Sequence, residues 1–396
     1  MGSTIFTPFT DEQLIPKEEK LEVLKKGKKF SIGIPKETCL NEKRLCITPD
    51  AVQVLVEHGH NIIIETGAGT PTFFTDLQFS EAGAQITSDP KEVYGQDLVL
   101  KINPPTEEEM EYLKPNAYLV SALQINLRDK EYFKKLAEKK VNAIAFEFIM
   151  DEYRQLSLIR LIGEIAGGMS ILYAAELLAK SNGLMLGGIT GVRPTEVVIL
   201  GAGIVGEFAT KAALGLGASV KVFDNSLSKL RRLHMMVDGR VPTSIIDPKE
   251  LSKSLKRADV VIGALSKISL CPIVTEEMVS KMKKGSVIID VTIDNGKVIE
   301  TSELTDMEHP YIIKHGVIHC GLPNLTSKMP RTTTKAVSNF FLSYLLNYDE
   351  EGGFENMLIR KNEMKQSLYM YKGRHTKKLI CDRFDLTYHD INLLIF

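Results

Sequence analysis

The chain has 396 residues, a length that favours two domains over a single hydrophobic core. Its hydrophobic content of 44% and charged content of 25% are typical of a globular protein that folds in water. The formal net charge of −1 at pH 7 argues against general attraction to nucleic acid or to an anionic membrane surface.

Three further features of the composition narrow the class of protein. The five cysteines are scattered without a C-x-x-C pair, which favours a reducing compartment, and the histidines form no metal-binding pattern. The first twenty residues lack a signal-peptide core, and no apolar run reaches the roughly 18 residues that span a bilayer. We therefore expect a cytoplasmic protein with no metal site, no membrane segment and no nucleic-acid partner.

From the N-terminus, the chain begins with a charged segment, residues 1–28, which we expect to be a helical extension. Short apolar runs then alternate with helix-favouring segments, a pattern typical of a parallel sheet with helical crossovers. The strands are expected at 30–35, 61–65, 98–101, 118–123 and 143–148, and the helices at 49–59, 75–82 and 106–114.

A long helix is expected over 157–180, and a glycine-rich turn then leads into a second α/β unit. Its strands are expected at 197–200, 220–223, 260–263, 287–290 and 316–320. The fold class is therefore α/β, with two Rossmann-like, doubly wound parallel-sheet domains and a cleft between them. We expect a substrate domain formed by 1–155 together with 322–396, and an NAD-binding domain formed by 156–321.

The segment 197–224 carries a dinucleotide-binding fingerprint between two predicted strands. Gly201 permits a tight turn, Gly203 lets the backbone approach a pyrophosphate, and Gly206 lets the helix pack closely on the strand. The helix N-terminus favours the phosphates. Asp224, 18 residues past Gly206, is placed to accept hydrogen bonds from the ribose hydroxyls and would repel a 2′-phosphate. The predicted cofactor is therefore NAD and not NADP.

Three other residues could carry chemistry, and each also has an ordinary structural interpretation. Arg44 follows the first strand and could clamp a carboxylate, or it could belong to a solvated loop. Lys101 ends an apolar strand and could polarise a carbonyl, or it could be a surface lysine. Asp290 and Asp294 are expected on one side of an extended segment, where Asp294 could face the nicotinamide or simply form a turn.

Taken together, the motifs of this chain resemble those of the alanine dehydrogenase family, which shares its fold with the NAD-binding part of proton-translocating transhydrogenase. The resemblance covers nearly all of residues 31–345. The motifs that carry it are IPKET…EKRLCITP (34–49), GHNIIIETGAG (59–69), LVLKINPP (98–105), GEIAG (163–167), LGGITGVRPTEVVILGAGIVG (186–206), VFDNSLSKLRRL (222–233), ADVVIGA (258–264) and GSVIIDVTIDNG (285–296).

The resemblance implies roles for individual positions. Arg44 corresponds to the arginine that binds the substrate carboxylate, Lys101 to the lysine beside it, and Asp294 to an aspartate close to nicotinamide and substrate. It implies oxidative deamination of L-alanine to pyruvate and ammonia by a homo-oligomer, a hexamer or a dimer. The complete expected cofactor site is Gly201, Gly203, Ile204, Val205, Gly206, Asp224, Lys229, Leu265, Ile293, Asp294 and Asn324.

Two departures from the family pattern bear on the chemistry. Gly163 stands where many members carry a serine that contacts the cofactor. Gln124 stands where the resemblance places an acid/base histidine, and glutamine cannot transfer a proton at neutral pH. Gln124 is therefore expected to orient the substrate, while Asp294, a lysine or a water chain moves the proton.

Other functions remain open from the sequence. A transhydrogenase-like NAD(H)-binding module would pass hydride to a partner domain, and a related amino-acid dehydrogenase would act on a different side chain. Because of Gln124 and Gly163, an NAD(H)-binding pseudoenzyme is a third alternative.

Overall fold

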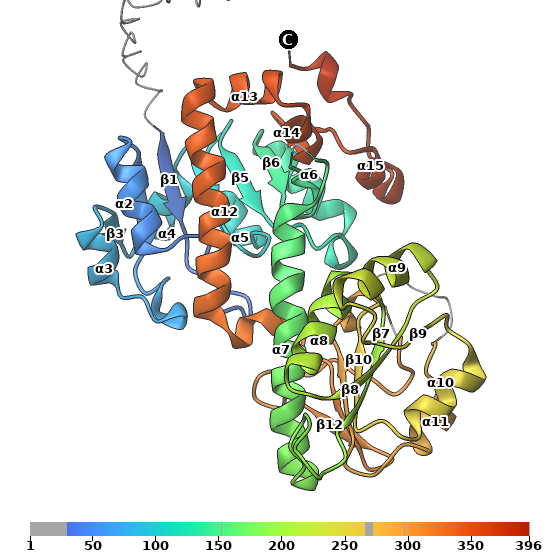
Figure 1. The fold of residues 1–396 in the computed structure, drawn as a ribbon. Coiled ribbons are helices and arrows are strands. Elements are labelled where there is room, and N and C mark those ends of the chain that lie inside the picture. Colours follow the sequence, from blue (N-terminus) through green and yellow to red (C-terminus); the bar gives the residue numbers. More distant parts are fainter. Residues whose placement is uncertain (1–29, 152, 266–271, 297, 396) are drawn as a thin grey trace, which may run out of the picture.

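The computed structural model describes residues 30–151, 153–265, 272–296 and 298–395 (Figure 1). The expected helical extension at 1–28 lies outside these residues. The described chain forms two sheets, each flanked by helices, and two long helices connect them.

The first sheet has eight strands in the order β15-β14-β6-β5-β4-β1-β2-β3. Strands β1 to β6 pair in parallel, and the order reverses between β1 and β4. A parallel α/β sheet opens a crevice at such a reversal, at the carboxyl ends of the strands. The strands are β1 (Ser31–Ile34), β2 (Asn61–Glu65), β3 (Gln85–Thr87), β4 (Leu98–Leu100), β5 (Tyr118–Ser121), β6 (Asn142–Ala145), β14 (Leu368–Tyr371) and β15 (Arg374–His375).

The second sheet has seven strands in the order β12-β13-β11-β10-β7-β8-β9, and its order reverses between β7 and β10. Its central strands are buried along their length, as expected where helices cover both faces. The strands are β7 (Glu196–Leu200), β8 (Ser219–Phe223), β9 (Thr243–Ser244), β10 (Val260–Gly263), β11 (Val287–Asp290), β12 (Ile312–Lys314) and β13 (Val317–Cys320).

The α/β class with two doubly wound, largely parallel sheets is confirmed, and the antiparallel strands lie at the edges. Strand β12 is antiparallel to β13, and β14 is antiparallel to both β6 and β15. Each edge hairpin turns through two residues with positive φ, His315-Gly316 and Lys372-Gly373. Such a short left-handed turn joins antiparallel strands and leaves no room for a crossover helix.

The helix α7 (Ser157–Asn182) runs along both halves of the molecule, and α12 (Pro330–Glu351) crosses the first sheet and packs on α7 (Figure 1). By length and mean hydropathy α7 could cross a membrane, whereas from the sequence we expected no segment of this kind. Half of its apolar window is buried, however, and the helix packs on α8 (Ile204–Gly215). It is therefore a core helix of this fold.

The other helices cover the faces and edges of the two sheets. Those beside the first sheet are α2 (Pro49–Glu57), α3 (Asp76–Glu81), α4 (Pro90–Tyr94), α5 (Glu107–Glu111), α6 (Lys130–Glu138), α13 (Phe354–Arg360), α14 (Asn362–Ser367) and α15 (Lys378–Phe384). Those beside the second sheet are α9 (Leu227–Met236), α10 (Pro248–Leu255) and α11 (Glu276–Ser280). The precise domain boundaries at 155/156 and 321/322 stay predictions.

Candidate active site

Arg44 lies on the loop after β1, at the reversal point of the first sheet, and is only 6% exposed. Its Nε and Nη2 donate to the two carboxylate oxygens of Glu42, at 2.7 and 2.5 Å. Its Nη1 donates to Thr326 Oγ1 at 3.1 Å. Arg44 is therefore a buried, oriented cation and does not belong to a solvated loop.

Lys101 directly follows β4 on the other side of the same reversal, and it is 1% exposed. Its ammonium lies 3.3 Å from carboxylate oxygens of both Glu37 and Glu109. Burial acts to lower the pKa of Lys101, but the two carboxylates outweigh it and raise the pKa. Lys101 is therefore a charged, fully enclosed lysine, and the surface interpretation is wrong.

Glu37 is buried and interacts both with the Lys101 ammonium and with the backbone that follows β4. It accepts hydrogen bonds from the backbone N–H groups of Ile102, at 2.6 Å, and Asn103, at 3.3 Å. Burial raises the pKa of Glu37 to about 7, although Lys101 and the two N–H groups act in the opposite direction. A carboxyl with this pKa exchanges a proton near neutral pH.

Gln124 follows β5 and joins the same group of side chains. Its Nε2 donates to Asn103 Oδ1 at 2.8 Å, and Asn103 Nδ2 donates to Glu42 Oε2 at 3.2 Å. The structure therefore brings together Arg44, Lys101 and Gln124, three predicted site residues, on loops after β1, β4 and β5. The side chains that connect them, Glu37, Glu42, Glu109 and Asn103, were not predicted as site residues.

A cavity of about 810 Å³ lies beside the reversal point of the second sheet. The predicted cofactor residues that line it are Gly203, Ile204, Val205, Lys229, Asp294 and Asn324. Gly163 also lines it, as expected for a position next to a cofactor. Arg160, Arg232 and Thr326 line it too and were not predicted. The lining therefore contains three cationic side chains, Arg160, Lys229 and Arg232, which suits a ligand with phosphate groups.

The glycine motif has the local structure that a dinucleotide requires. Gly201 has a φ of +115°, and a Cβ at Gly206 would lie 1.8 Å from the carbonyl oxygen of Gly201. A Cβ at Gly203 would meet no atom within 4 Å, so this position faces open space at the start of α8. No side chain caps α8, whose first N–H groups remain available for a pyrophosphate. The residues present therefore fit NAD.

Asp224 follows β8 and is 4% exposed. Its Oδ2 accepts from the backbone N–H of Ala202 at 2.8 Å and its Oδ1 from that of Ser226 at 2.7 Å. It holds the glycine turn against β8, and each oxygen retains a lone pair for a ribose hydroxyl. Five of the predicted cofactor residues lie outside the lining of the cavity, and their cofactor roles stay predictions. They are Gly201, Gly206, Asp224, Leu265 and Ile293.

The expectation for Asp290 and Asp294 was wrong in its geometry. Asp290 ends β11 and is buried, whereas Asp294 is exposed and lies in a short 3-10 helix, η4 (Ile293–Asn295). The chain turns at residues 291–292, directly after β11, so the alternation of an extended segment ends before Asp294. Asp294 lines the cavity, and Asp290 does not.

The two parts of the site meet at η5 (Leu325–Lys328). Thr326 lines the cavity and accepts from Arg44, and Ser327 Oγ donates to Glu42 Oε1 at 3.0 Å. The predicted carboxylate-binding arginine therefore adjoins the predicted cofactor cavity. In the sequence, Thr326 and Ser327 were marked only by their position just after Asn324, a predicted cofactor residue.

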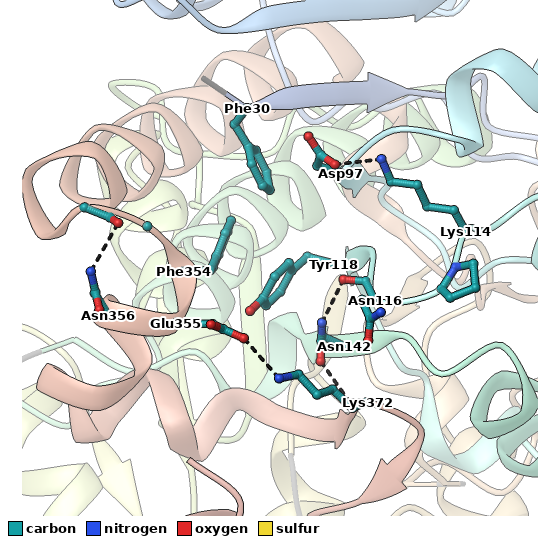
Figure 2. A pocket seen from close by; sticks show the side chains of 13 residues that line it. Phe30, Asp97, Lys114, Asn116, Tyr118, Asn142, Phe354, Glu355, Asn356 and Lys372 are labelled. Atoms are coloured by element: carbon teal, nitrogen blue, oxygen red, sulfur yellow. Dashed lines mark hydrogen bonds and ion pairs between the residues drawn. The ribbon is translucent and has the colours of Figure 1, made fainter. Parts of the chain in front are cut away.

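A second hollow, of about 390 Å³, lies at the amino ends of the strands in the first sheet and contains none of the predicted site residues (Figure 2). Tyr118 stacks on Phe354 there with ring centroids 4.4 Å apart. Lys114 pairs with Asp97, and Lys372 pairs with Glu355. The stack of Tyr118 on Phe354 fastens the C-terminal segment to the sheet, on the edge opposite Arg44 and Lys101.

Comparison with known proteins gives consistent matches over most of the chain. Residues 33–166 match the family described as alanine dehydrogenase/PNT, N-terminal domain, and residues 170–378 match its C-terminal domain. Alanine dehydrogenase 2 of Staphylococcus aureus (strain USA300) is 37% identical over 372 residues, which cover 91% of this chain and 98% of the relative.

Two solved structures are similar in fold. A structure described as L-alanine dehydrogenase has a TM-score of 0.83 and 32% identity, covering 90% of this chain and 99% of its own. A transhydrogenase from Sinorhizobium meliloti has a TM-score of 0.74 and 20% identity, covering 88% and 99%, and shows the fold alone.

Proposed function

The chain belongs to the alanine dehydrogenase/PNT family, and from that premise we propose that its cleft deaminates L-alanine with NAD. The balanced reaction converts L-alanine, NAD⁺ and water into pyruvate, ammonium, NADH and one proton, and it is reversible. The observation that carries the proposal is the contact between Arg44 and Thr326, because it joins a buried carboxylate-binding cation to the wall of the NAD cavity.

In this proposal Arg44 holds the substrate carboxylate. Glu42 occupies the Nε hydrogen and one Nη2 hydrogen, and Thr326 occupies one Nη1 hydrogen, so one hydrogen on each Nη atom remains for the substrate carboxylate. Lys101 supplies a second positive charge at the same end of the cleft. Bound beside the substrate, NAD⁺ would supply the acceptor for the hydride from Cα.

The reaction also requires proton transfer, and Gln124 cannot supply it. Asp294 is exposed on the cavity wall, so it can exchange a proton with a water molecule there. Glu37, beside Lys101, is a second group that can hold a proton near neutral pH. We assign proton transfer to Asp294 through water, with Lys101 and Glu37 at the carboxylate end.

The test is formation of NADH from L-alanine and NAD⁺ at alkaline pH, followed by its absorbance, with pyruvate and ammonium for the reverse reaction. Lys101→Ala is the control, and we expect it to lower kcat/KM by roughly 10²-fold or more because it removes a buried charge at the substrate end. Wild-type turnover no higher than that of Lys101→Ala would refute the proposal.

The presence of Gln124 also favours a second candidate, a protein that binds NAD(H) without turning over an amino acid. Tight NADH binding in calorimetry, together with no oxidation of NADH by pyruvate or other keto acids in the presence of ammonium, would support that function over the first.

We also propose that the protein is a cytoplasmic homo-oligomer, a hexamer or a dimer. The cysteines Cys39, Cys46, Cys320 and Cys381 are free thiols, as in a reducing compartment. Exposed apolar side chains gather where α7 ends and the glycine-rich turn passes Leu216, with Gly188 N donating to Leu216 O at 3.1 Å. They are Leu184, Met185, Ile189, Val192 and Leu216, which we call the turn patch.

A further inference from the structure

A chain of hydrogen bonds connects Gln124 to Arg44. Gln124 Nε2 donates to Asn103 Oδ1 at 2.8 Å, and Asn103 Nδ2 donates to Glu42 Oε2 at 3.2 Å. Glu42 in turn binds the Arg44 guanidinium with both of its oxygens. The hydrogen bonds therefore connect the half-buried Gln124, through the buried Asn103, to a fixed ion pair.

Glu42 determines which group donates and which accepts in each hydrogen bond between Gln124 and Arg44. Burial acts to raise the pKa of Glu42, but the adjacent Arg44 outweighs burial and holds the pKa below its usual value. The ionised carboxylate can only accept hydrogen bonds. Asn103 must therefore turn its NH₂ group toward Glu42 and its oxygen toward Gln124, which in turn must donate its own NH₂ group. Neither amide can be flipped without placing two acceptors, or two donors, face to face.

The backbone of Gln124 is held as firmly as its side chain. The N–H groups of Leu123 and Gln124 both donate to the Glu147 carboxylate, at 2.9 Å. Gln124 adopts a left-handed conformation with a φ of +50°, and its N–H group donates to Glu147. Among the described residues, none donates a hydrogen bond to Gln124 Oε1. The side-chain oxygen is therefore an oriented acceptor that remains available for a ligand.

We propose that Gln124 recognises the amino group of the substrate, and that Asn103 and Glu42 are positioning residues that fix its oxygen as the acceptor. The inference rests on the proposed function, since it assumes an amino acid in the cleft. An ammonium group has only donors, so it complements this oxygen. With the carboxylate on Arg44, the substrate is then bound at two points, and a carboxylic acid that lacks the amine loses one of them.

The test compares L-alanine with propionate, which has the same carboxylate and carbon chain but no amine. Both are titrated into the complex with NADH, where no hydride can be transferred to the cofactor, and binding is followed by NADH fluorescence. For wild type we expect L-alanine to bind roughly tenfold more tightly than propionate, because propionate leaves the Gln124 oxygen without a donor.

Two variants should abolish that preference. Gln124→Met keeps the length of the side chain but removes the acceptor, and Asn103→Ala releases the glutamine so that it can rotate. In both we expect the ratio of the two dissociation constants to fall to about one, with propionate binding changed less than about twofold. Their combination should be no worse than Gln124→Met alone, since both changes remove a single contact.

Gln85→Met is the matched control. Gln85 is an exposed glutamine on β3 that bonds Glu92 at 2.8 Å, so the preference for L-alanine should persist. Equal loss of L-alanine and propionate binding in Gln124→Met would indicate a merely structural role and overturn the proposal, as would an unchanged ratio. Because this measurement needs no turnover, it is independent of the deamination assay: absent turnover refutes the proposed function, and an unchanged ratio refutes the role of Gln124.

Discussion

At the scale of single residues, Glu37 and Lys101 show how burial sets the properties of this cleft. The lysine ammonium lies between Glu37 and Glu109, while Glu42 neutralises Arg44. Counted as ionised, these five groups carry three negative and two positive charges. One proton retained on Glu37 would balance the group, which agrees with its raised pKa. The same proton is then available near neutral pH.

The raised pKa of Glu37 makes a prediction about stability. Its folded pKa, about 7, lies above the ordinary value of 4.5, so between these values the folded state binds more protons than the unfolded chain. Stability should therefore fall as the pH rises through this interval. In Glu37→Gln this contribution should be lost, so the difference in free energy of unfolding between wild type and variant should change by roughly 1–3 kcal/mol from pH 5 to pH 8.

Urea denaturation at several pH values measures this difference. Glu57→Gln, on the exposed side of α2, is the control and should parallel wild type. If Glu37→Gln also ran parallel to wild type over the whole interval, the Glu37 carboxyl would be ionised throughout, and its assignment as a proton-holding group would be wrong.

At the scale of elements, the turn between β7 and α8 contains glycines that have two different roles. Gly206 is required for the packing of the protein itself, because its Cβ would lie 1.8 Å from the Gly201 oxygen. Gly203 has open space around it and a φ of −75°, which any residue can adopt. The sequence motif presents the two glycines alike, but the structure assigns one to folding and the other to the ligand.

We therefore expect opposite consequences from two alanine substitutions. Gly206→Ala should destabilise the protein by about 3 kcal/mol or more, since α8 must move away from β7. Gly203→Ala should change stability by no more than about 1 kcal/mol but should weaken NADH binding at least tenfold, because the methyl group enters the path of the pyrophosphate. Thermal unfolding and NADH titration measure both. Equal loss of stability in the two variants would contradict this division of roles.

At the scale of the whole molecule, the turn patch predicts an interface between copies of the chain. Ile189→Asp places a charge within it, and size-exclusion chromatography with light scattering should then show a smaller assembly than wild type. Ile245→Asp is the matched control, since Ile189 and Ile245 are each 55% exposed but Ile245 lies outside the patch. An assembly of unchanged mass in Ile189→Asp would place the interface elsewhere, and a monomeric wild type would exclude it.

The sequence by itself determined the strands, the long helix and the cofactor. Strands such as 61–65, 260–263 and 287–290 were predicted with their observed bounds, because buried parallel strands are short apolar runs that a local window reveals. The NAD fingerprint was also readable, since the spacing of Gly201, Gly203 and Gly206 reflects the geometry of a single turn.

Only the tertiary structure decided how the site is assembled. Arg44 meets Thr326, 282 residues away, and Glu42 meets Ser327, 285 residues away, because α12 and η5 return to the first sheet. The free oxygen of Gln124 depends on that same Glu42, through Asn103. No local pattern encodes these contacts, since they depend on how two sheets dock. The sequence determined that the chain binds NAD, whereas the fold determined which groups surround the substrate and which way each one points.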